Sequence, residues 1–159
     1  MRDRNLAPAA LVGAIVCCGA TALITAASEG LGYACAARLA AEKCAIAICG
    51  RHEQTLTEAR ANLLKAGARE AVAIKADIAE REGIERLMAQ TLAQFGRLDI
   101  LIVNGGHIAY GGLEDLTDQQ WQEAFDLLLM SAVRLTRLVL PIMRANKGGD
   151  IVVLGSATA

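Results

Sequence analysis

Short apolar runs alternate along this chain with longer stretches whose apolar residues recur every three or four positions. The first pattern is typical of strands that are buried on both faces, and the second is typical of helices that cover a sheet. Strands and helices that alternate in this way build βαβ units. The sequence therefore predicts an α/β fold with a doubly wound parallel sheet of about five strands.

The expected elements follow from this alternation and from turn residues between them. We expect strands at 21–25, 45–49, 71–75, 100–103 and 151–154, and helices at 31–42, 54–66, 82–95 and from 119 to about 143. Thr117 and Gln120 have the spacing of a capping box, which would open the long helix. Pro141 is expected to kink or fray the last turn of this helix.

A glycine-containing loop, Thr25-Ala26-Ala27-Ser28-Glu29-Gly30-Leu31-Gly32, lies between the first expected strand and the first expected helix. A helix N-terminus offers unpaired N–H groups and the positive end of a dipole, and glycines let the backbone approach a pyrophosphate. This arrangement predicts a dinucleotide site formed by Thr25, Ala26, Ser28, Glu29, Gly30, Leu31 and Gly32.

Charge and composition exclude several other classes of protein. The formal net charge of −1 and the scattered Lys and Arg residues argue against a nucleic-acid partner. The five cysteines include no C-x-x-C pair, and the two histidines complete no metal spacing. We therefore expect the cysteines to be small buried hydrophobic residues in a reducing compartment, with no metal site.

The N-terminal region contains no charged residue from Leu6 to Ser28, and Arg2 and Arg4 precede it. Such a segment resembles a signal peptide or a membrane span. Its second half, however, is needed for the first strand and the glycine loop, and the remaining residues 6–18 are too few to span a bilayer. We expect a cytoplasmic protein with an apolar extension (1–18) and a nucleotide-binding domain (19–159). Membrane association or secretion through Leu6–Cys18 remains the alternative.

The glycine loop resembles the T-G-x-x-x-G-[IL]-G motif of the short-chain dehydrogenase/reductase family, with Ala26 in place of the first glycine. Four further landmarks follow successive strands at family spacing, namely Arg51, Asp77-Ile78, Asn104-Gly105-Gly106 and Ser156. The resemblance covers residues 19–159 and extends to a divergent branch often labelled 3-oxoacyl-carrier-protein-reductase-like. It implies a Rossmann-type domain that is incomplete at its C-terminal side.

The resemblance also implies a cofactor. Arg51 stands where the family reads the adenosine ribose and could pair with a 2′-phosphate, which favours NADP(H) over NAD(H). Glu29, by contrast, occupies a position that is often basic in relatives that use NADP. Asp77 and Ile78 would contact the adenine, and Asn104, Gly105 and Gly106 would line the cofactor. If Ala26 requires a positive φ, it costs about 1 kcal/mol relative to glycine.

The resemblance implies four catalytic residues, of which this sequence matches one. In this family a Tyr acts as general acid/base, a Lys four residues later lowers its pKa, a Ser positions the substrate carbonyl and an Asn supports a proton relay. Ser156 matches the Ser, whereas Leu128 stands at the Asn position. Neither Tyr33 nor Tyr110 has a Lys four residues later, and His107 is expected to be an ordinary loop residue.

Two hypotheses about function follow. The first is an oxidoreductase domain that binds NADP(H), performs hydride transfer on a carbonyl or hydroxyl substrate in its complete form, and is catalytically incomplete within these 159 residues. The second is a non-catalytic nucleotide-binding or interaction module. The substrate would be a small molecule of unknown identity. Because Leu127, Met130, Val133 and Leu138 are expected to be partly exposed, homo-oligomerisation through the 119–143 helix is also predicted.

Overall fold

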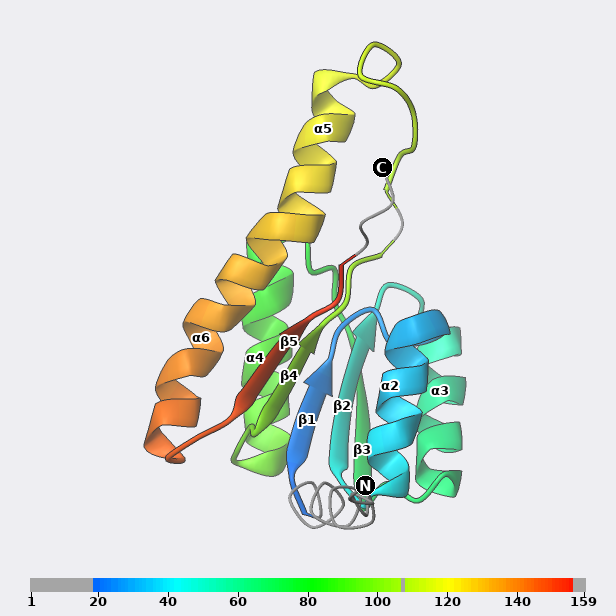
Figure 1. The fold of residues 1–159 in the computed structure, drawn as a ribbon. Helices are drawn as coiled ribbons and strands as arrows, with labels where there is room; N and C mark the ends of the chain where they lie inside the picture. The colour runs from blue at the N-terminus through cyan, green and yellow to red at the C-terminus, as the bar shows by residue number, and fades with distance from the viewer. Residues whose placement is uncertain (1–18, 107, 156–159) are drawn as a thin grey trace, which may run out of the picture.

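The sheet has five parallel strands in the order β3-β2-β1-β4-β5. The computed structural model describes residues 19–106 and 108–155 (Figure 1). The strands are β1 (Thr21–Ile24), β2 (Ala45–Gly50), β3 (Glu70–Lys75), β4 (Ile100–Val103) and β5 (Asp150–Val153). The predicted fold class is confirmed, and every expected strand lies within one residue of its observed bounds.

Helices cover both faces of this sheet (Figure 1). One face is covered by α2 (Gly30–Ala41) and α3 (Glu53–Lys65), and the other by α4 (Arg81–Phe95) and α6 (Ser131–Ala145). The chain adds β2 and β3 on one side of β1 and then returns to add β4 and β5 on the other. Because of this reversal, the connections that follow β1 and β4 lead away from each other and leave a crevice between them. Ligands of open α/β sheets bind in such a crevice.

The strands send alternate side chains to two separate apolar cores. Ala22 and Ile24 of β1 pack under α2 and α3, where small residues such as Ala36 and Ala40 allow close helix-on-sheet packing. Leu23, between them, faces the opposite core with residues of α4 and α6. Burial on both faces explains why the strands read as nearly continuous apolar runs.

The long helix consists of three segments: α5 (Asp118–Phe125), the π-helical turn η1 (Asp126–Met130) and α6. Its predicted capping box is confirmed, because the Thr117 hydroxyl accepts from the Gln120 amide and the Gln120 side chain accepts from the Thr117 amide at 2.9 Å. The sequence did not indicate the π-helical turn. None of the residues of α5 is buried, and α5 extends beyond the sheet (Figure 1).

Pro141 lies inside α6 and does not fray its end. The helix continues to Ala145, and the amides of Asn146 and Gly148 donate to the carbonyls of Ile142 and Met143 at 3.0 and 2.9 Å. The expectation that Pro141 frays the last turn was therefore wrong. The carbonyls that follow the proline find amide partners beyond the helix end, which keeps that turn hydrogen-bonded.

Several sequence expectations concern residues outside the described part of the chain. These are the apolar extension 1–18, His107 and Ser156. Within residues 19–106 and 108–155, no helix has the length and hydropathy needed to cross a membrane. The same residues contain no cluster of His, Cys, Asp or Glu that could hold a metal ion. Cys44 and Cys49 are buried, as expected for small apolar residues, whereas Cys35 is only partly buried.

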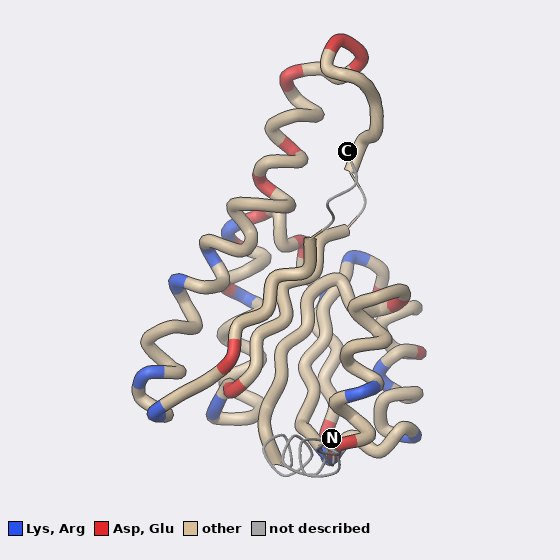
Figure 2. The backbone as a smooth tube through the Cα atoms, in the orientation of Figure 1, with Lys and Arg blue, Asp and Glu red and all other residues tan. Residues whose placement is uncertain are grey.

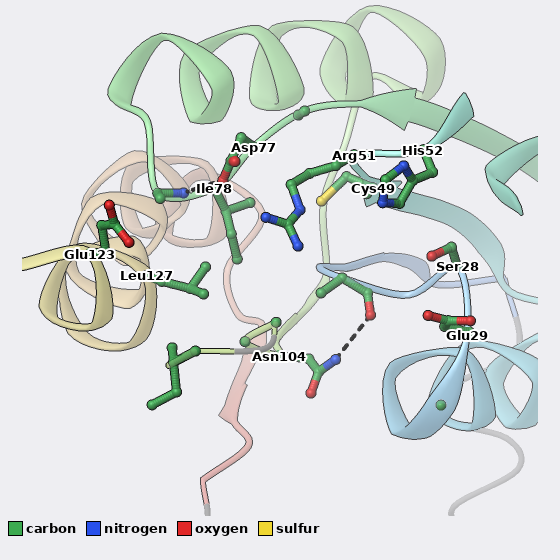
Figure 3. A pocket seen from close by; sticks show the side chains of 18 of the residues that line it. Ser28, Glu29, Cys49, Arg51, His52, Asp77, Ile78, Asn104, Glu123 and Leu127 are labelled. Carbon is green, nitrogen blue, oxygen red and sulfur yellow. Dashed lines mark hydrogen bonds between the residues drawn. The ribbon is translucent and has the colours of Figure 1, made fainter. Parts of the chain in front are cut away.

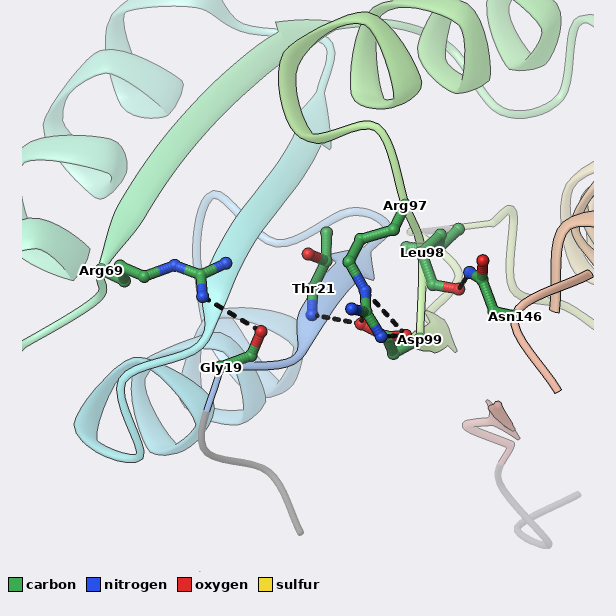
Figure 4. A network of polar contacts seen from close by, with 7 residues as sticks. All are labelled: Gly19, Thr21, Arg69, Arg97, Leu98, Asp99 and Asn146. Carbon is green, nitrogen blue, oxygen red and sulfur yellow. Dashed lines mark hydrogen bonds and ion pairs between the residues drawn. The ribbon is translucent and has the colours of Figure 1, made fainter. Parts of the chain in front are cut away.

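Asp99 joins β1 to β4 at the amino-terminal edge of the sheet (Figure 4). Its carboxylate accepts the Thr21 amide at 2.9 Å and the Arg97 guanidinium at 2.7 Å. Its own amide donates to the Thr21 carbonyl. Burial tends to raise the pKa of Asp99, but the hydrogen bonds from Arg97 and Thr21 and the charges of Arg97 and Arg69 together hold it below its usual range.

This depressed pKa predicts a specific acid sensitivity. Asp99 contributes stability that is present above the usual aspartate pKa of about 3.9 and is lost as the pH falls through its lower folded-state value. We expect Asp99→Asn to lower the free energy of unfolding by about 1 kcal/mol at pH 7, and the difference to vanish at low pH. Urea unfolding from pH 2 to 7 measures this, with the exposed Asp150→Asn as the matched control. A difference that persists unchanged at pH 2 would contradict it.

Candidate functional site

A cavity of about 600 Å³ opens at the carboxyl ends of the central strands (Figure 3). Four segments line it: the β1–α2 loop, the end of β2, the β3–α4 loop and the β4–α5 loop, with the long helix closing one side. Of the predicted cofactor residues, those that line this cavity are Ala26, Ser28, Glu29, Gly30, Leu31, Arg51, Asp77, Ile78, Asn104, Gly105 and Gly106.

The β1–α2 loop contains a left-handed residue at the position where the motif has its first glycine. Ala26 has φ 46°, so the condition for strain at this residue is met. Its carbonyl accepts the side-chain amide of Asn104 at 3.0 Å, a bond that Figure 3 draws as a dashed line. The loop is thus held in its turned conformation from the β4 side, although alanine disfavours that backbone geometry.

The amino end of α2 faces the cavity without a side-chain cap. Glu29 occupies the N-cap position, but its side chain makes no capping hydrogen bond. The first amides of a helix have no acceptor within the helix, and those of Gly30 and Leu31 belong to residues that line the cavity. This end of α2 therefore offers free donors and the positive end of the helix dipole to an anion.

Two predicted cofactor residues, Thr25 and Gly32, lie behind the loop and do not line the cavity. The buried Thr25 hydroxyl donates to the Asn104 carbonyl at 2.8 Å and accepts from the Asn104 amide at 2.9 Å. A Cβ on Gly32 would lie 2.7 Å from both the Ala26 carbonyl oxygen and the Asn104 side chain. Thr25 therefore bridges the loop to the end of β4, and Gly32 leaves room for the loop's backbone.

Arg51 follows β2 and extends its guanidinium into the cavity, and Ser28 and Glu29 of the β1–α2 loop lie at the same end of it (Figure 3). Among the described lining residues, Arg51 is the cation, and Glu29, Asp77 and Glu123 are the carboxylates. Cys49 lies on β2, and burial raises the pKa of its thiol to about 12. Its side chain is accordingly a neutral part of the cavity floor at physiological pH.

The β3–α4 loop forms the next wall, and its backbone is closely packed. The Asp77 carboxylate accepts the Ala79 amide at 3.0 Å. A Cβ on Gly83 would lie 2.0 Å from the Asp77 carbonyl oxygen, so only glycine allows α4 to approach this loop. Ile78, between Asp77 and Ala79, contributes an apolar surface to the cavity.

The far wall combines the glycines after β4 with leucines from η1. Leu127 lines the cavity, and Leu128 lies so close to Gly105 that a Cβ there would be 2.8 Å from its Cδ2 atom. Leu128, at the position where the family has Asn, thus provides a methyl group at this wall and no polar group. Sequence reasoning did not identify the lining residues Cys49, Gly50, His52, Ala76, Ala79, Ile108, Ala109, Gln120, Glu123, Ala124 and Leu127.

The sequence could have indicated some of these lining residues but not others. Gly50, His52, Ala76 and Ala79 adjoin predicted site residues, so their proximity could have been inferred from the motifs. The residues of α5 and η1 could not, because helical periodicity alone does not show which side of a projecting helix faces the sheet.

Comparison with known proteins agrees with this geometry. Residues 20–159 match the family model described as short chain dehydrogenase. A dehydrogenase/reductase SDR family member 4 from Caenorhabditis elegans is 32% identical over 142 residues, which cover 89% of this chain and 55% of the relative. An uncharacterized NAD-dependent oxidoreductase from Mycobacterium tuberculosis is 34% identical over 152 residues, covering 87% of this chain and 55% of the relative.

A solved structure shows the same arrangement of elements. L-Sorbose reductase from Gluconobacter frateurii, complexed with NADPH and L-sorbose, superposes with a TM-score of 0.83 at 35% identity. The match covers 87% of this chain and 53% of that structure. The chain thus spans about half the length of the relatives it matches. Since the family model accounts for nearly all of its described residues, this chain belongs to the short-chain dehydrogenase family.

Proposed function

We propose that this domain binds NADP(H) and that the protein, in its complete form, transfers hydride between this cofactor and a carbonyl or hydroxyl substrate. The observation that carries the proposal is the position of Arg51, whose guanidinium enters a cavity that also receives the uncapped amino end of α2. We further propose that the protein acts in the cytoplasm.

The polar end of the cavity fits a dinucleotide that carries a 2′-phosphate. The amides at the start of α2 would donate to the pyrophosphate, and the absence of a side chain at Gly32 lets the loop lie close to them. Arg51 would pair with the 2′-phosphate in a charge-assisted contact. Asp77 and Ile78 would lie along the adenine, and the glycines after β4 would border the nicotinamide half.

Glu29 reduces the preference for NADP(H) over NAD(H). Its side chain lines the same end of the cavity as Arg51 (Figure 3), and a carboxylate repels a phosphate but accepts hydrogen bonds from ribose hydroxyls. One relative is named as NAD-dependent, and the similar L-sorbose reductase was solved with NADPH. We therefore propose a preference for NADP(H) that is real but smaller than Arg51 alone would produce.

The chemistry requires a proton donor for the oxygen that gains negative charge during hydride transfer to a carbonyl. When bound, NADPH supplies the hydride. Among the described lining residues, Gly105, Gly106 and Leu127 carry no acid/base group, and Glu123, one turn before Leu127, does not stand at the position of the family's Tyr or Lys. This favours binding without turnover in the 159-residue chain, and it is also what a non-catalytic nucleotide-binding module would show.

Titration of NADPH and NADH, followed by the fluorescence of the reduced nicotinamide, tests the cofactor proposal. We expect tighter binding of NADPH. Arg51→Ala should lower the affinity for NADPH at least tenfold, about the effect of one charge-assisted hydrogen bond, and leave the affinity for NADH almost unchanged. Glu29→Gln should strengthen NADPH by about threefold. The control is Arg38→Ala, which removes an exposed cation paired with Glu42 on α2.

Equal binding of both cofactors, or an Arg51→Ala variant that still prefers NADPH, would contradict the proposed cofactor. Oxidation of NADPH in the presence of a panel of ketones and quinones separates binding from chemistry. We expect binding without measurable turnover from this chain. Sustained turnover would show that a proton donor is present after all.

The strained Ala26 provides a second test of the same site. We expect Ala26→Gly to raise the free energy of unfolding by about 0.5–1 kcal/mol, because glycine adopts a positive φ without the steric cost that alanine carries. NADPH affinity should rise by about threefold, since the backbone can then approach the pyrophosphate more closely. Ala27→Gly is the matched control and should destabilise, because Ala27 is fully buried and has no positive φ. A loss of stability in Ala26→Gly would refute the strain argument.

We also propose that the long helix pairs with the same helix of a second copy in antiparallel orientation. Its exposed large apolar side chains include Trp121, Phe125 and Leu129, which are spaced four residues apart and so share one face. Charged side chains are separated along its length: residues 114–126 carry only acidic groups and residues 127–147 only basic groups (Figure 2). An antiparallel pair would place each acidic half beside a basic half.

Sedimentation velocity over a range of concentrations tests this self-association. We expect a dimer that dissociates as the salt concentration rises, because the paired halves are exposed and therefore screened. Phe125→Lys should shift the equilibrium to monomer, since it places a charge in the apolar stripe. Leu64→Lys, which alters a similarly exposed leucine on α3, should not. A protein that is monomeric at every concentration, or two variants that behave alike, would contradict the pairing.

A further inference from the structure

Arg134 of α6 reaches the β3–α4 loop, 55 residues earlier in the chain. One of its terminal nitrogens donates to the Ala79 carbonyl at 2.8 Å, and the other donates to the Asp126 carboxylate at 2.9 Å. The Arg134 side chain is only 20% exposed. A largely buried guanidinium requires such partners, so the geometry ties three separate segments together.

The bond to Ala79 fixes a wall of the cavity. Ala79 follows Asp77 and Ile78, and all three line the cavity. The Ala79 amide is already bound by the Asp77 carboxylate, so Arg134 secures the remaining polar group of the same residue. Asp77 is in turn held by the close approach of Gly83. The loop is therefore held from outside at several points: the Ala76 amide donates to the Gly50 carbonyl at 3.0 Å, Gly83 packs on Asp77, and Arg134 joins the loop to α6.

The hydrogen bond from Arg134 to Asp126 fixes the start of η1. Asp126 is the first residue of η1, and Leu127, which follows it, lines the far wall of the cavity. The second carboxylate oxygen of Asp126 accepts the Gln122 side chain at 2.8 Å, so this residue also spans the junction between α5 and η1. Arg134 thus sets the position of the Asp77–Ala79 wall relative to the wall that carries Leu127.

We infer that Arg134 is a positioning residue for nucleotide binding: it does not itself line the cavity, but its bond to the Ala79 carbonyl holds the β3–α4 loop where that loop can meet the adenine half of the cofactor. This inference rests on the proposed function. A planar guanidinium is needed because its two terminal nitrogens diverge toward the carbonyl and the carboxylate. A lysine ammonium at this position would reach one of them well and the other poorly.

Three variants test the role of Arg134. Arg134→Met keeps the apolar stem and removes both donors, Arg134→Lys keeps the charge, and Arg137→Met is the matched control on the exposed side of α6. We expect Arg134→Met to weaken both NADPH and the adenine fragment 2′,5′-ADP by about tenfold, the effect of losing a hydrogen bond to a charged group. Arg134→Lys should lose about threefold by the same reasoning, and Arg137→Met less than twofold.

A double-variant cycle separates positioning from general destabilisation. If Arg134 acts through the loop, its loss should matter little when Asp77→Ala has already released the Ala79 amide. A purely structural effect would be additive in that background. Additive losses, or an Arg134→Met variant that binds 2′,5′-ADP like the parent, would overturn the inference.

Hydrogen exchange of the Ala79 amide provides a readout that does not depend on the cofactor. We expect this amide to exchange at least about tenfold faster in folded Arg134→Met, or in Arg134→Lys if the first variant does not fold, while the Leu23 amide in β1 is unchanged. If the parent fails to bind NADPH, the proposed function fails, and the exchange rate alone decides the role of Arg134. Unchanged exchange at Ala79 would overturn that role.

Discussion

The paired hydrogen bonds between Thr25 and Asn104 are the constraint on which the cavity depends. They join the loops that leave β1 and β4, the two neighbouring strands from which the chain departs in different directions. The Asn104 side chain extends the same connection to Ala26 and holds its backbone in the left-handed region. Without this link, the sheet would still pair, but the amino end of α2 would not be held against the loop that follows β4.

The second constraint is the path of the long helix, which reaches from the far end of the cavity to the amino-terminal edge of the sheet. Its upper part closes the cavity, and its lower part packs on β4 and α4 through Leu135 and Val139. The π-helical turn between them changes the direction in which successive side chains point. As a result Leu127 and Leu128 face the glycines after β4, and the polar groups of Asp126 face Arg134.

Most of the fold could be predicted from the sequence because it depends on local patterns. The apolar runs located all five strands to within one residue, and Thr117 and Gln120 located the start of the long helix. The glycine motif also pointed to Ala26 as the position where a positive φ would cost free energy, and the structure has φ 46° there.

The rest depended on contacts between distant residues, which no local pattern records. The exchange of hydrogen bonds between Thr25 and Asn104 turns a predicted ligand contact into a support for the loop. The π-helical turn has no signature in Asp126–Met130, and the reach of Arg134 to Ala79 requires the relative positions of two helices. The fraying expected at Pro141 does not occur, because the amides of Asn146 and Gly148 donate to the carbonyls of Ile142 and Met143.

The buried thiol of Cys49 has a consequence for the chemistry that this domain can tolerate. Because burial raises its pKa to about 12, the Cys49 thiol is protonated at neutral pH. Peroxides and electrophiles react with the thiolate and not with the thiol, so the floor of the cavity is protected from oxidation even where it borders the nucleotide site. Among the cysteines that the structure describes, we expect the half-buried Cys35 on α2, outside the cavity, to be modified before Cys49, which would leave the nucleotide site intact under oxidative stress.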